Sequence, residues 1–319
     1  MRARSTVTVP APAKINLLLY VLERQSTGYH EIVSLMQMVD LQDQLSLMLQ
    51  PIRYGIRIVT RNQTLPLGED NLITRASRAF MKHYGVETGL RIQLDKKIPI
   101  GAGLGGGSSD AAATLYGLCG LHQMTPSRRE LSALGRVLGS DVPFFFGGPT
   151  AWVSGIGDRI DPASLGENLW AVLANPGFEV STAWVYSELD RARTGGLTQP
   201  ATFLKKIGLT LDQNRNKISS RASKAFPLTK RSFPLHNDLE VITIRRYPVI
   251  ETMKERLCSL GAKEALMSGS GPTVFGLFPD RLTAHAAAVV LRQDAEKGWG
   301  LRHGGWTIWV TRLLNRSLW

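Results

Sequence analysis

The order of apolar and polar residues along the chain predicts both strands and helices. Alternation with a period of two indicates a strand with one solvated face, and apolar residues three and four apart indicate one face of a helix. Alternation is clear at 42–49 and 54–60, which predicts a half-solvated antiparallel sheet. Further strands are predicted at 90–100, 150–155, 169–177, 274–278 and 306–314. Helices are predicted at 71–85, 108–121, 126–139, 239–260 and 281–294, with Ser127 as the N-cap of the third.

Two prolines interrupt the first apolar segment, residues 5–21. Pro10 and Pro12 stand in its first half, and AKINLLLYV follows. Because proline lacks the N–H group that a sheet ladder uses, this segment predicts a strand, a turn and a second apolar strand.

The mixture of elements indicates an α+β fold in both halves of the chain. It lacks the repeating strand–helix rhythm of a doubly wound sheet. A chain of 319 residues is long enough for two domains. Gly155, Gly157, Pro162 and Gly166 cluster at the expected boundary, so we predict domains at 1–160 and 161–319.

Composition is typical of a soluble globular protein, with 43% hydrophobic and 20% charged residues. No apolar run approaches the roughly 20 residues of a spanning helix, and the N-terminal segment lacks the apolar core of a signal peptide, so we expect a cytoplasmic protein. Cys119 and Cys258 belong to no CxxC motif, and the six histidines show no paired metal spacing. We therefore expect any metal to arrive with a substrate.

The net charge of +12 suggests a polyanionic partner. Much of the excess lies in residues 193–232, where nine Lys and Arg residues stand against Asp212 alone. This stretch also carries glycine, proline and many small polar residues, without the interleaved aromatic residues of single-strand nucleic-acid binders. A solvated basic insertion is the favoured interpretation, and RNA or membrane binding through it stays open.

A glycine-rich segment carries the strongest chemical signal. IPIGAGLGGGSSDAAATL at 98–115 places five glycines between a predicted strand and a predicted helix. Glycine lets the backbone approach a ligand closely, and the unpaired N–H groups at a helix start attract anions. A turn that only changes chain direction needs one or two glycines. The segment therefore predicts a phosphate-binding loop.

Two familiar nucleotide loops do not fit this segment. A Walker A loop would place Lys and Ser or Thr where Gly107 and Ser108 stand. The GxGxxG pattern at Gly101, Gly103 and Gly106 fits a dinucleotide fold only if a second strand ends in an acid about 20 residues on. That region reads GLHQMTPSRREL, so the dinucleotide interpretation fails.

The glycine segment and six further motifs resemble the GHMP kinases. Within that family they are most similar to the branch that phosphorylates a cytidine-diphosphate-linked methylerythritol on the non-mevalonate route to isoprenoid precursors. The resemblance runs in order over nearly the whole chain. The further motifs are APAKINLLLYV (11–21), GYHEI (28–32), GSDVPFFFGG (139–148), NPG (175–177), HNDLE (236–240) and MSGSGPTVFGLF (267–278).

This resemblance implies a fold, a reaction and partners. The first domain would be similar to ribosomal protein S5 and the second would be ferredoxin-like. ATP, carried with Mg²⁺, would donate its γ-phosphate to the 2-hydroxyl group of the small-molecule acceptor. No nucleic acid or membrane partner is implied, and a homodimer stays open.

The resemblance also implies catalytic roles for Lys14 and Asp141. Asp141 matches the family's catalytic base; taken alone, an aspartate at a helix start would be its N-cap, and the other motifs favour the base. Lys14 lies between Ala13 and Ile15 in an apolar strand, where an unpaired charge would be costly. Paired with Asp141, its ammonium would stabilise charge on the transferred phosphoryl group.

The remaining candidates bind the two substrates. Tyr29 and His30 match positions that hold the cytosine, Tyr186 falls near a second stacking aromatic, and Asn16 shares a strand face with Lys14. The acceptor and phosphates would also contact Ser268, Gly269, Ser270 and Gly271. ATP would contact Asn71, Lys96, Pro99, Ile100, Gly101, Ala102, Gly103, Leu104, Gly105, Gly106, Gly107, Ser108 and Ser109. Thr27 departs from the family pattern, which often has an acid before GYH.

Two alternatives remain at this point. A mevalonate or homoserine kinase of the same family would share the glycine segment but would have no need of GYHEI, because it binds no cytosine. An RNA-binding protein with an S5-like fold would explain the +12 charge but leaves the glycines, Lys14 and Asp141 unexplained.

Overall fold

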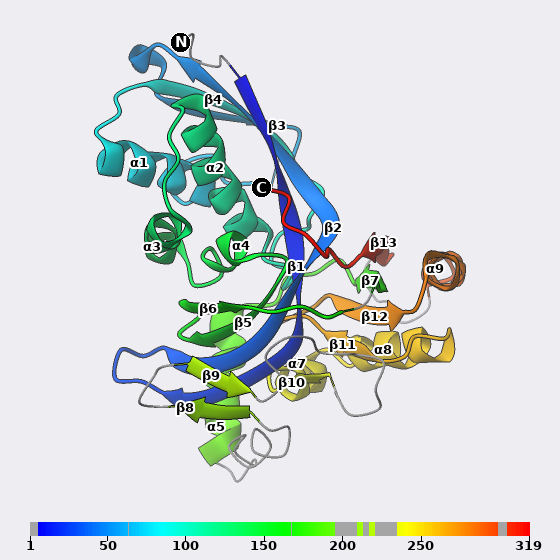
Figure 1. Ribbon diagram of the computed structural model, residues 1–319. Coiled ribbons are helices and arrows are strands. Elements are labelled where there is room, and N and C mark those ends of the chain that lie inside the picture. The colour runs from blue at the N-terminus through cyan, green and yellow to red at the C-terminus, as the bar shows by residue number, and fades with distance from the viewer. Residues whose placement is uncertain are drawn as a thin grey trace.

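The computed structural model describes residues 6–62, 64–166, 168–194, 209–212, 217–220, 235–298 and 305–319, with 209–212 and 217–220 described as backbone only. These residues build two main sheets with helices packed against them (Figure 1), which confirms the α+β class. Most of the basic stretch at 193–232 lies outside the described residues. No described helix has the length and apolar character needed to cross a membrane.

The larger sheet contains seven strands in the described part of the chain, and two long antiparallel strands, β1 and β2, are its spine. The first half of β2 pairs with β5 and its second half pairs with β4. One edge of β2 therefore carries two different neighbouring strands. The strands are β1 (Thr6–Arg24), β2 (His30–Gln50), β3 (Ile56–Thr60), β4 (Gly89–Asp95), β5 (Thr150–Gly155), β6 (Arg159–Pro162) and β10 (His236–Asn237).

The second sheet is antiparallel and has the order β11-β12-β7-β13. Its strands are β7 (Trp170–Asn175), β11 (Ala265–Met267), β12 (Val274–Phe278) and β13 (Thr307–Arg312). A separate hairpin pairs β8 (Leu209–Asp212) with β9 (Lys217–Ser220).

The helices fall into three groups. Helices α1–α4 lie along one side of the larger sheet, α8 and α9 lie beside the second sheet, and α5 and α7 contact each other (Figure 1). The elements are the 3₁₀ turn η1 (Ile52–Tyr54), α1 (Leu72–Tyr84), α2 (Gly106–Leu121), α3 (Arg128–Leu138), α4 (Phe144–Gly147), α5 (Thr182–Thr194), α7 (Glu240–Arg246), α8 (Val249–Ser259) and α9 (Arg281–Glu296).

The alanine-rich helix α2 packs closely on the spine of the larger sheet. A β-carbon added to Gly117 would lie 2.8 Å from Leu47 of β2, so the helix backbone approaches the sheet closely. Ala111, Ala112 and Leu115 are fully buried in the same core. This packing places the N-terminus of α2 over the middle of the molecule.

The first strand differs from its prediction. β1 runs without a turn from Thr6 to Arg24, with its register against β2 shifted between Pro12 and Lys14. The neighbouring strand β10 pairs only with Leu18 and Leu19. Along Pro10 and Pro12 the other side of β1 is therefore free of a described strand, and an edge strand tolerates proline.

The predicted helix at 239–260 is two helices, α7 and α8, which meet at Tyr247 and Pro248. Proline has no N–H for the helical hydrogen bond and its ring collides with the preceding turn, so a new helix begins there. Ser127 does cap α3, as predicted, because its hydroxyl accepts a hydrogen bond from the Glu130 amide.

The chain crosses between the two sheets more than once. β6 ends at Pro162 and β7 begins at Trp170, but β10 returns to the larger sheet. At the C-terminus, Trp319 stacks on Tyr116 of α2 and donates its indole N–H to the carbonyl of Pro10. The division at residue 160 therefore stays a prediction.

Candidate active site

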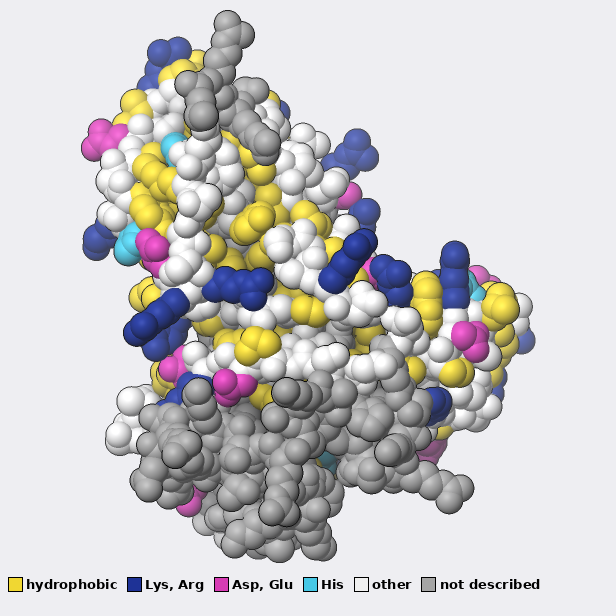
Figure 2. Space-filling model, in the orientation of Figure 1, with side chains coloured by type: hydrophobic (Ala, Val, Ile, Leu, Met, Phe, Trp, Pro, Cys, Tyr) yellow, Lys and Arg dark blue, Asp and Glu magenta, His cyan; other side chains and the backbone are white. Residues whose placement is uncertain are grey.

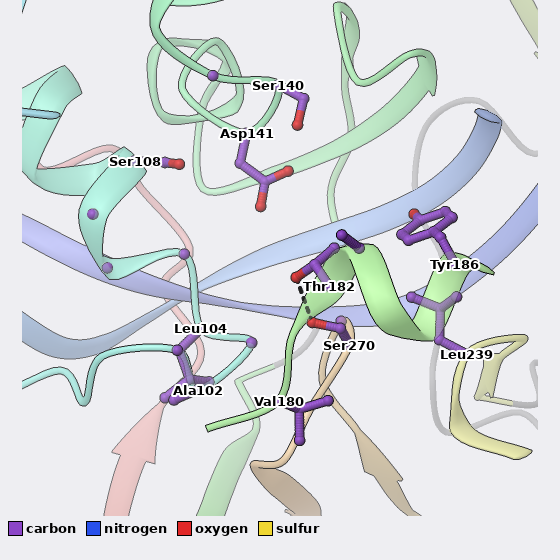
Figure 3. A pocket seen from close by; sticks show the side chains of 18 of the residues that line it. Ala102, Leu104, Ser108, Ser140, Asp141, Val180, Thr182, Tyr186, Leu239 and Ser270 are labelled. Atoms are coloured by element: carbon purple, nitrogen blue, oxygen red, sulfur yellow. Dashed lines mark hydrogen bonds between the residues drawn. The ribbon is translucent and has the colours of Figure 1, made fainter. Parts of the chain in front are cut away.

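A cavity of about 1140 Å³ opens between the glycine-rich segment, strands β1 and β2, and helix α5 (Figure 3). Most of the predicted site residues line it, although they come from distant parts of the sequence. The predicted residues on its wall are Lys14, Asn16, Tyr29, His30, Asn71, Lys96, Pro99, Ile100, Gly101, Ala102, Gly103, Leu104, Gly105, Gly106, Gly107, Ser108, Asp141, Tyr186, Gly269 and Ser270.

The glycine segment wraps around the N-terminus of α2. Gly101, Gly103 and Gly105 have φ angles of 62°, 76° and 68°, which side-chain-bearing residues rarely adopt. Gly105 is the N-cap of α2, and no side chain caps the first turn. The unpaired amides and the positive end of the helix dipole therefore face the cavity, which is the arrangement that binds phosphate groups.

The same glycines are packed against neighbouring segments. A β-carbon on Gly103 would collide with the carbonyl of Ser268, and one on Gly105 would lie 2.9 Å from Cγ of Lys14. The Ser268 hydroxyl donates to the Gly103 carbonyl at 3.0 Å and accepts a hydrogen bond from the backbone N–H of Asn16 at 3.3 Å. Ser268 thus ties the glycine segment to β1 and does not line the cavity.

Lys14 is buried, and its ammonium has two polar side-chain neighbours. Its Nζ donates to Oδ1 of Asn16 at 2.5 Å and lies 3.6 Å from Oδ2 of Asp141. Asn16 in turn donates to the hydroxyl of Ser34 at 2.9 Å, which fixes the orientation of the amide. Asp141 is 29% exposed, and its carboxylate points into the cavity beside Ser108 of α2 (Figure 3).

Lys96 is held behind the glycine segment by two buried carboxylates. Its Nζ donates to Asp43 at 2.5 Å and to Asp110 at 2.7 Å. Burial lowers the pKa of Lys96, but Asp110 and Asp43 outweigh burial and hold that pKa above its ordinary value. Asp43 also accepts hydrogen bonds from the amides of Lys97 and Ile98, so the cluster anchors the start of the glycine segment.

Burial raises the pKa of Asp110 to about 7, against the opposing effect of Lys96. Asp110 shares the Lys96 ammonium with Asp43, so the ammonium offsets the burial of Asp110 only in part. Its second oxygen, Oδ1, is buried without a hydrogen-bond partner among the described residues.

Aromatic residues gather at the other end of the cavity. Tyr29 is 62% exposed on the rim, whereas the His30 ring is buried against Tyr186, with centroids 5.0 Å apart. Burial raises the pKa of Tyr186. Nε2 of His30 lies 2.6 Å from Oδ1 of Asp190 on α5. This end can hold a planar ring between aromatic side chains.

A further turn with two glycines, 268–271, closes the cavity from the second half of the chain. Gly269 and Ser270 line the wall, and the hydroxyls of Ser270 and Thr182 lie 2.8 Å apart (Figure 3). Gly271 lies behind them, and its amide donates to the carbonyl of Ser268.

Two other predicted residues are engaged locally. The side-chain oxygen of Asn71 accepts the Ile73 amide as the N-cap of α1, and its amide group donates to Pro66. Asn71 still lines the cavity. Ser109 is buried inside α2 and is absent from the cavity wall.

Sequence reasoning missed several residues that shape this site. The helix α5 was not predicted, although Ser181 at its start and the apolar pair Val185 and Leu189 are signals for it. Asp190 follows Tyr186 by four positions and therefore shares its helix face. Asp43 and Asp110 carried no local signal, because only the folded chain brings them to Lys96.

The geometry supports transfer of a phosphoryl group. Backbone amides at a helix start can hold a polyphosphate, and the partly exposed carboxylate of Asp141 can orient or deprotonate a hydroxyl group. Lys14 supplies a fixed positive charge between these two features.

Comparisons with known proteins agree with this geometry. The model for the N-terminal domain of GHMP kinases matches residues 71–148, which include the glycine segment and Asp141. The model for the C-terminal domain of GHMP kinases matches residues 224–297.

A relative from Syntrophotalea carbinolica, named 4-diphosphocytidyl-2-C-methyl-D-erythritol kinase, is 44% identical over 91% of this chain and 95% of its own. A solved structure titled 4-(cytidine 5'-diphospho)-2C-methyl-D-erythritol kinase superposes with a TM-score of 0.71 at 33% identity, covering 96% of this chain and 99% of that one. The homoserine kinase of Cytophaga hutchinsonii, at 21% identity, 99% and 97% coverage and a TM-score of 0.68, shares the fold.

Proposed function

The chain belongs to the 4-diphosphocytidyl-2-C-methyl-D-erythritol kinases of the GHMP family, and on this premise we propose the reaction that it catalyses. It is an ATP-dependent small-molecule kinase. It transfers the γ-phosphoryl group of ATP to the 2-hydroxyl of 4-diphosphocytidyl-2-C-methyl-D-erythritol, a step in the formation of isoprenoid precursors.

One observation carries the assignment of roles within the site: the Lys14 ammonium and the Asp141 carboxylate, 3.6 Å apart, share a cavity with the uncapped N-terminus of α2. In the proposed step, the acceptor oxygen forms a bond to the γ-phosphorus while the bond from that phosphorus to the bridging oxygen of ADP breaks. The hydroxyl proton passes to Asp141. Lys14 and the α2 amides stabilise the charge on the phosphoryl oxygens.

Magnesium fits this site as a companion of ATP. No group of three or more His, Cys, Asp or Glu side chains among the described residues could hold a metal. Mg²⁺ commonly takes one or two carboxylates together with phosphates and water. The Ser108 hydroxyl faces the same part of the cavity as Asp141 (Figure 3), so we infer that it would complete the shell of an ion held chiefly by the triphosphate, with the Asp141 carboxylate left to take the hydroxyl proton. The ion would neutralise phosphate charge.

The other end of the cavity suits the cytidine. Stacking faces for a pyrimidine come from Tyr29 and Tyr186, and ring nitrogens come from His30. Arg24 and Arg191 also line the wall there. A mevalonate or homoserine acceptor has no base to fill this end. The enzyme would work in the cytoplasm, where ATP is available.

RNA binding is less well supported. On the face shown in Figure 2, the Lys and Arg side chains of the described residues are separated by apolar and uncharged atoms. Such an arrangement differs from the continuous basic surface expected of a nucleic-acid-binding domain.

The test is a coupled assay of ADP release with three acceptors: the cytidine substrate, mevalonate and homoserine. We expect ADP release above the acceptor-free rate only with the cytidine substrate, and a new phosphomonoester signal in its ³¹P spectrum. ADP release only with mevalonate or homoserine would refute the proposed acceptor. An RNA-binding assay over a salt series serves as the control for the alternative class.

A further inference from the structure

The contact between His30 and Asp190 has a consequence for base recognition. Nε2 of His30 and Oδ1 of Asp190 are 2.6 Å apart, and the His30 side chain is only 7% exposed. The guanidinium of Arg24, 3.7 Å from the other carboxylate oxygen, supplies a positive charge on the far side of Asp190. The imidazole is therefore held in one orientation by a fixed partner.

An ionised carboxylate can only accept hydrogen bonds, so Nε2 must carry the proton in this contact. In a neutral imidazole the second nitrogen, Nδ1, is then an acceptor. Nδ1 has no hydrogen-bond partner within the described part of the chain, and His30 lines the cavity between Tyr29 and Tyr186. The ring thus offers one acceptor to a ligand at this end.

Cytosine and uracil differ in what they present to such an acceptor. Cytosine carries an amino group at position 4, a donor, where uracil carries an oxygen, an acceptor. An acceptor facing another acceptor leaves both groups unpaired in a buried site, which costs binding free energy.

Resting on the proposed function, we propose that position 4 of the base faces Nδ1 of His30, and that Asp190 is a positioning residue that sets the Nε2–H tautomer of His30 and thereby makes the site select cytidine over uridine substrates. Asp190 acts through His30 in this proposal, although Asp190 also lies on the cavity wall. It lies one helical turn beyond Tyr186 on α5, so the same helix supplies the stacking ring and the group that orients His30.

The kinetic test compares kcat/KM for 4-diphosphocytidyl-2-C-methyl-D-erythritol with kcat/KM for its uridine counterpart. In Asp190→Asn the amide can accept from or donate to Nε2, so it no longer dictates the tautomer. We expect the cytidine-to-uridine ratio to fall about tenfold, chiefly through KM, on the scale of one mismatched buried hydrogen bond. An unchanged ratio in Asp190→Asn would overturn the proposal.

Glu188→Gln is the matched control. Glu188 lies on the same helix and pairs with Arg191, but it is absent from the cavity wall. Its substitution removes one negative charge from α5 and frees Arg191 of the cavity wall without reaching His30, so it should act alike on both substrates and leave the ratio unchanged. An equal fall in both variants would mean that charge near the site, rather than the tautomer, sets the preference.

A second readout addresses the tautomer itself. The ¹⁵N chemical shifts of His30, assigned by comparison with His30→Gln, distinguish the Nε2–H form, the Nδ1–H form and the imidazolium. We expect the Nε2–H form in the native protein and a mixture in Asp190→Asn. An imidazolium or an Nδ1–H form in the native protein would overturn the proposal.

Binding separates this inference from the proposed function, because it needs no turnover. Calorimetry with CDP and UDP, in the presence of a nonhydrolysable ATP analogue, measures base preference directly. Tighter binding of CDP without ADP release from any acceptor would refute the kinase proposal and support the base selection. Equal kcat/KM for phosphorylation of the cytidine and uridine substrates would support the kinase proposal and refute the base selection.

Discussion

The ammonium of Lys14 lies 3.6 Å from Oδ2 of Asp141, although Lys14 stands in the first strand and Asp141 just before α4. The distance is longer than that of a direct hydrogen bond, so each group can still turn to a ligand between them. Lys14 already donates to Asn16, and Asp141 is partly exposed to the cavity. The two side chains are therefore fixed in position, and both remain able to contact a ligand.

We expect Asp141→Asn and Lys14→Met each to lower kcat by about 10²-fold or more, the usual scale for removal of an acid–base or charge-stabilising group. The folded state should persist, because asparagine preserves the shape of Asp141 and methionine fills the volume of Lys14. Steady-state kinetics together with circular dichroism would check this. The control is Asp158→Asn, a carboxylate of similar exposure outside the cavity wall, which should keep native turnover.

We expect Gly105→Ala to reduce both stability and turnover. Its φ angle of 68° should cost about 1–2 kcal/mol once a β-carbon is present. The new carbon would also press on Cγ of Lys14, only 2.9 Å away. Gly107→Ala is the control for stability: it lies inside α2, its β-carbon would meet only Leu72 at 3.5 Å, and alanine favours a helix. Urea unfolding of the two variants should move in opposite directions.

We expect Tyr29→Ala to raise KM for the cytidine substrate about tenfold with little change in kcat, since stacking on a base is worth about 1–3 kcal/mol. Tyr29 is 62% exposed, so its removal should not disturb folding. Tyr54→Ala removes another exposed tyrosine, which contacts Arg53 and Arg57 away from the cavity. A similar rise of KM in both variants would contradict a specific role for Tyr29.

The buried cluster around Lys96 should make stability depend on pH. The pKa of Asp110 is about 7 in the folded protein and about 3.8 in the unfolded chain, so the folded protein binds the extra proton between these values. The stabilisation that Asp110 contributes by binding this proton is fully present below pH 4 and is lost as the pH rises through 7. The pKa of Lys96 is raised above its ordinary value, so Lys96 stays charged throughout this window.

Asp110→Asn removes this titration. We expect the free energy of unfolding of the native protein, minus that of the variant, to fall with rising pH between 5 and 7, at up to about 1.4 kcal/mol per pH unit. Urea unfolding at pH 5, 6, 7 and 8 would measure it. A difference that stays constant from pH 5 to 7 would show that Asp110 is already ionised in the folded protein at pH 5.

Local patterns of residues were enough to predict much of this protein. The glycine segment, the alanine-rich helix after it and the Ser127 cap depend on residues within a few positions of one another, where backbone conformation and helix-end hydrogen bonds are decided. The order of motifs was enough to indicate the GHMP kinase family. The same local reasoning was wrong at Pro10 and Pro12, because whether a strand tolerates proline depends on which neighbour lies beside it.

Only the tertiary structure decided which distant groups meet. Lys96, predicted as an ATP contact, has its ammonium between Asp43 and Asp110. Nε2 of His30 lies within hydrogen-bond distance of Asp190. Ion pairs and tautomers depend on distances and burial that arise when strands and helices from separate parts of the chain pack together. The sequence determined the chemical groups available, and packing determined which of them face a ligand and which neutralise each other.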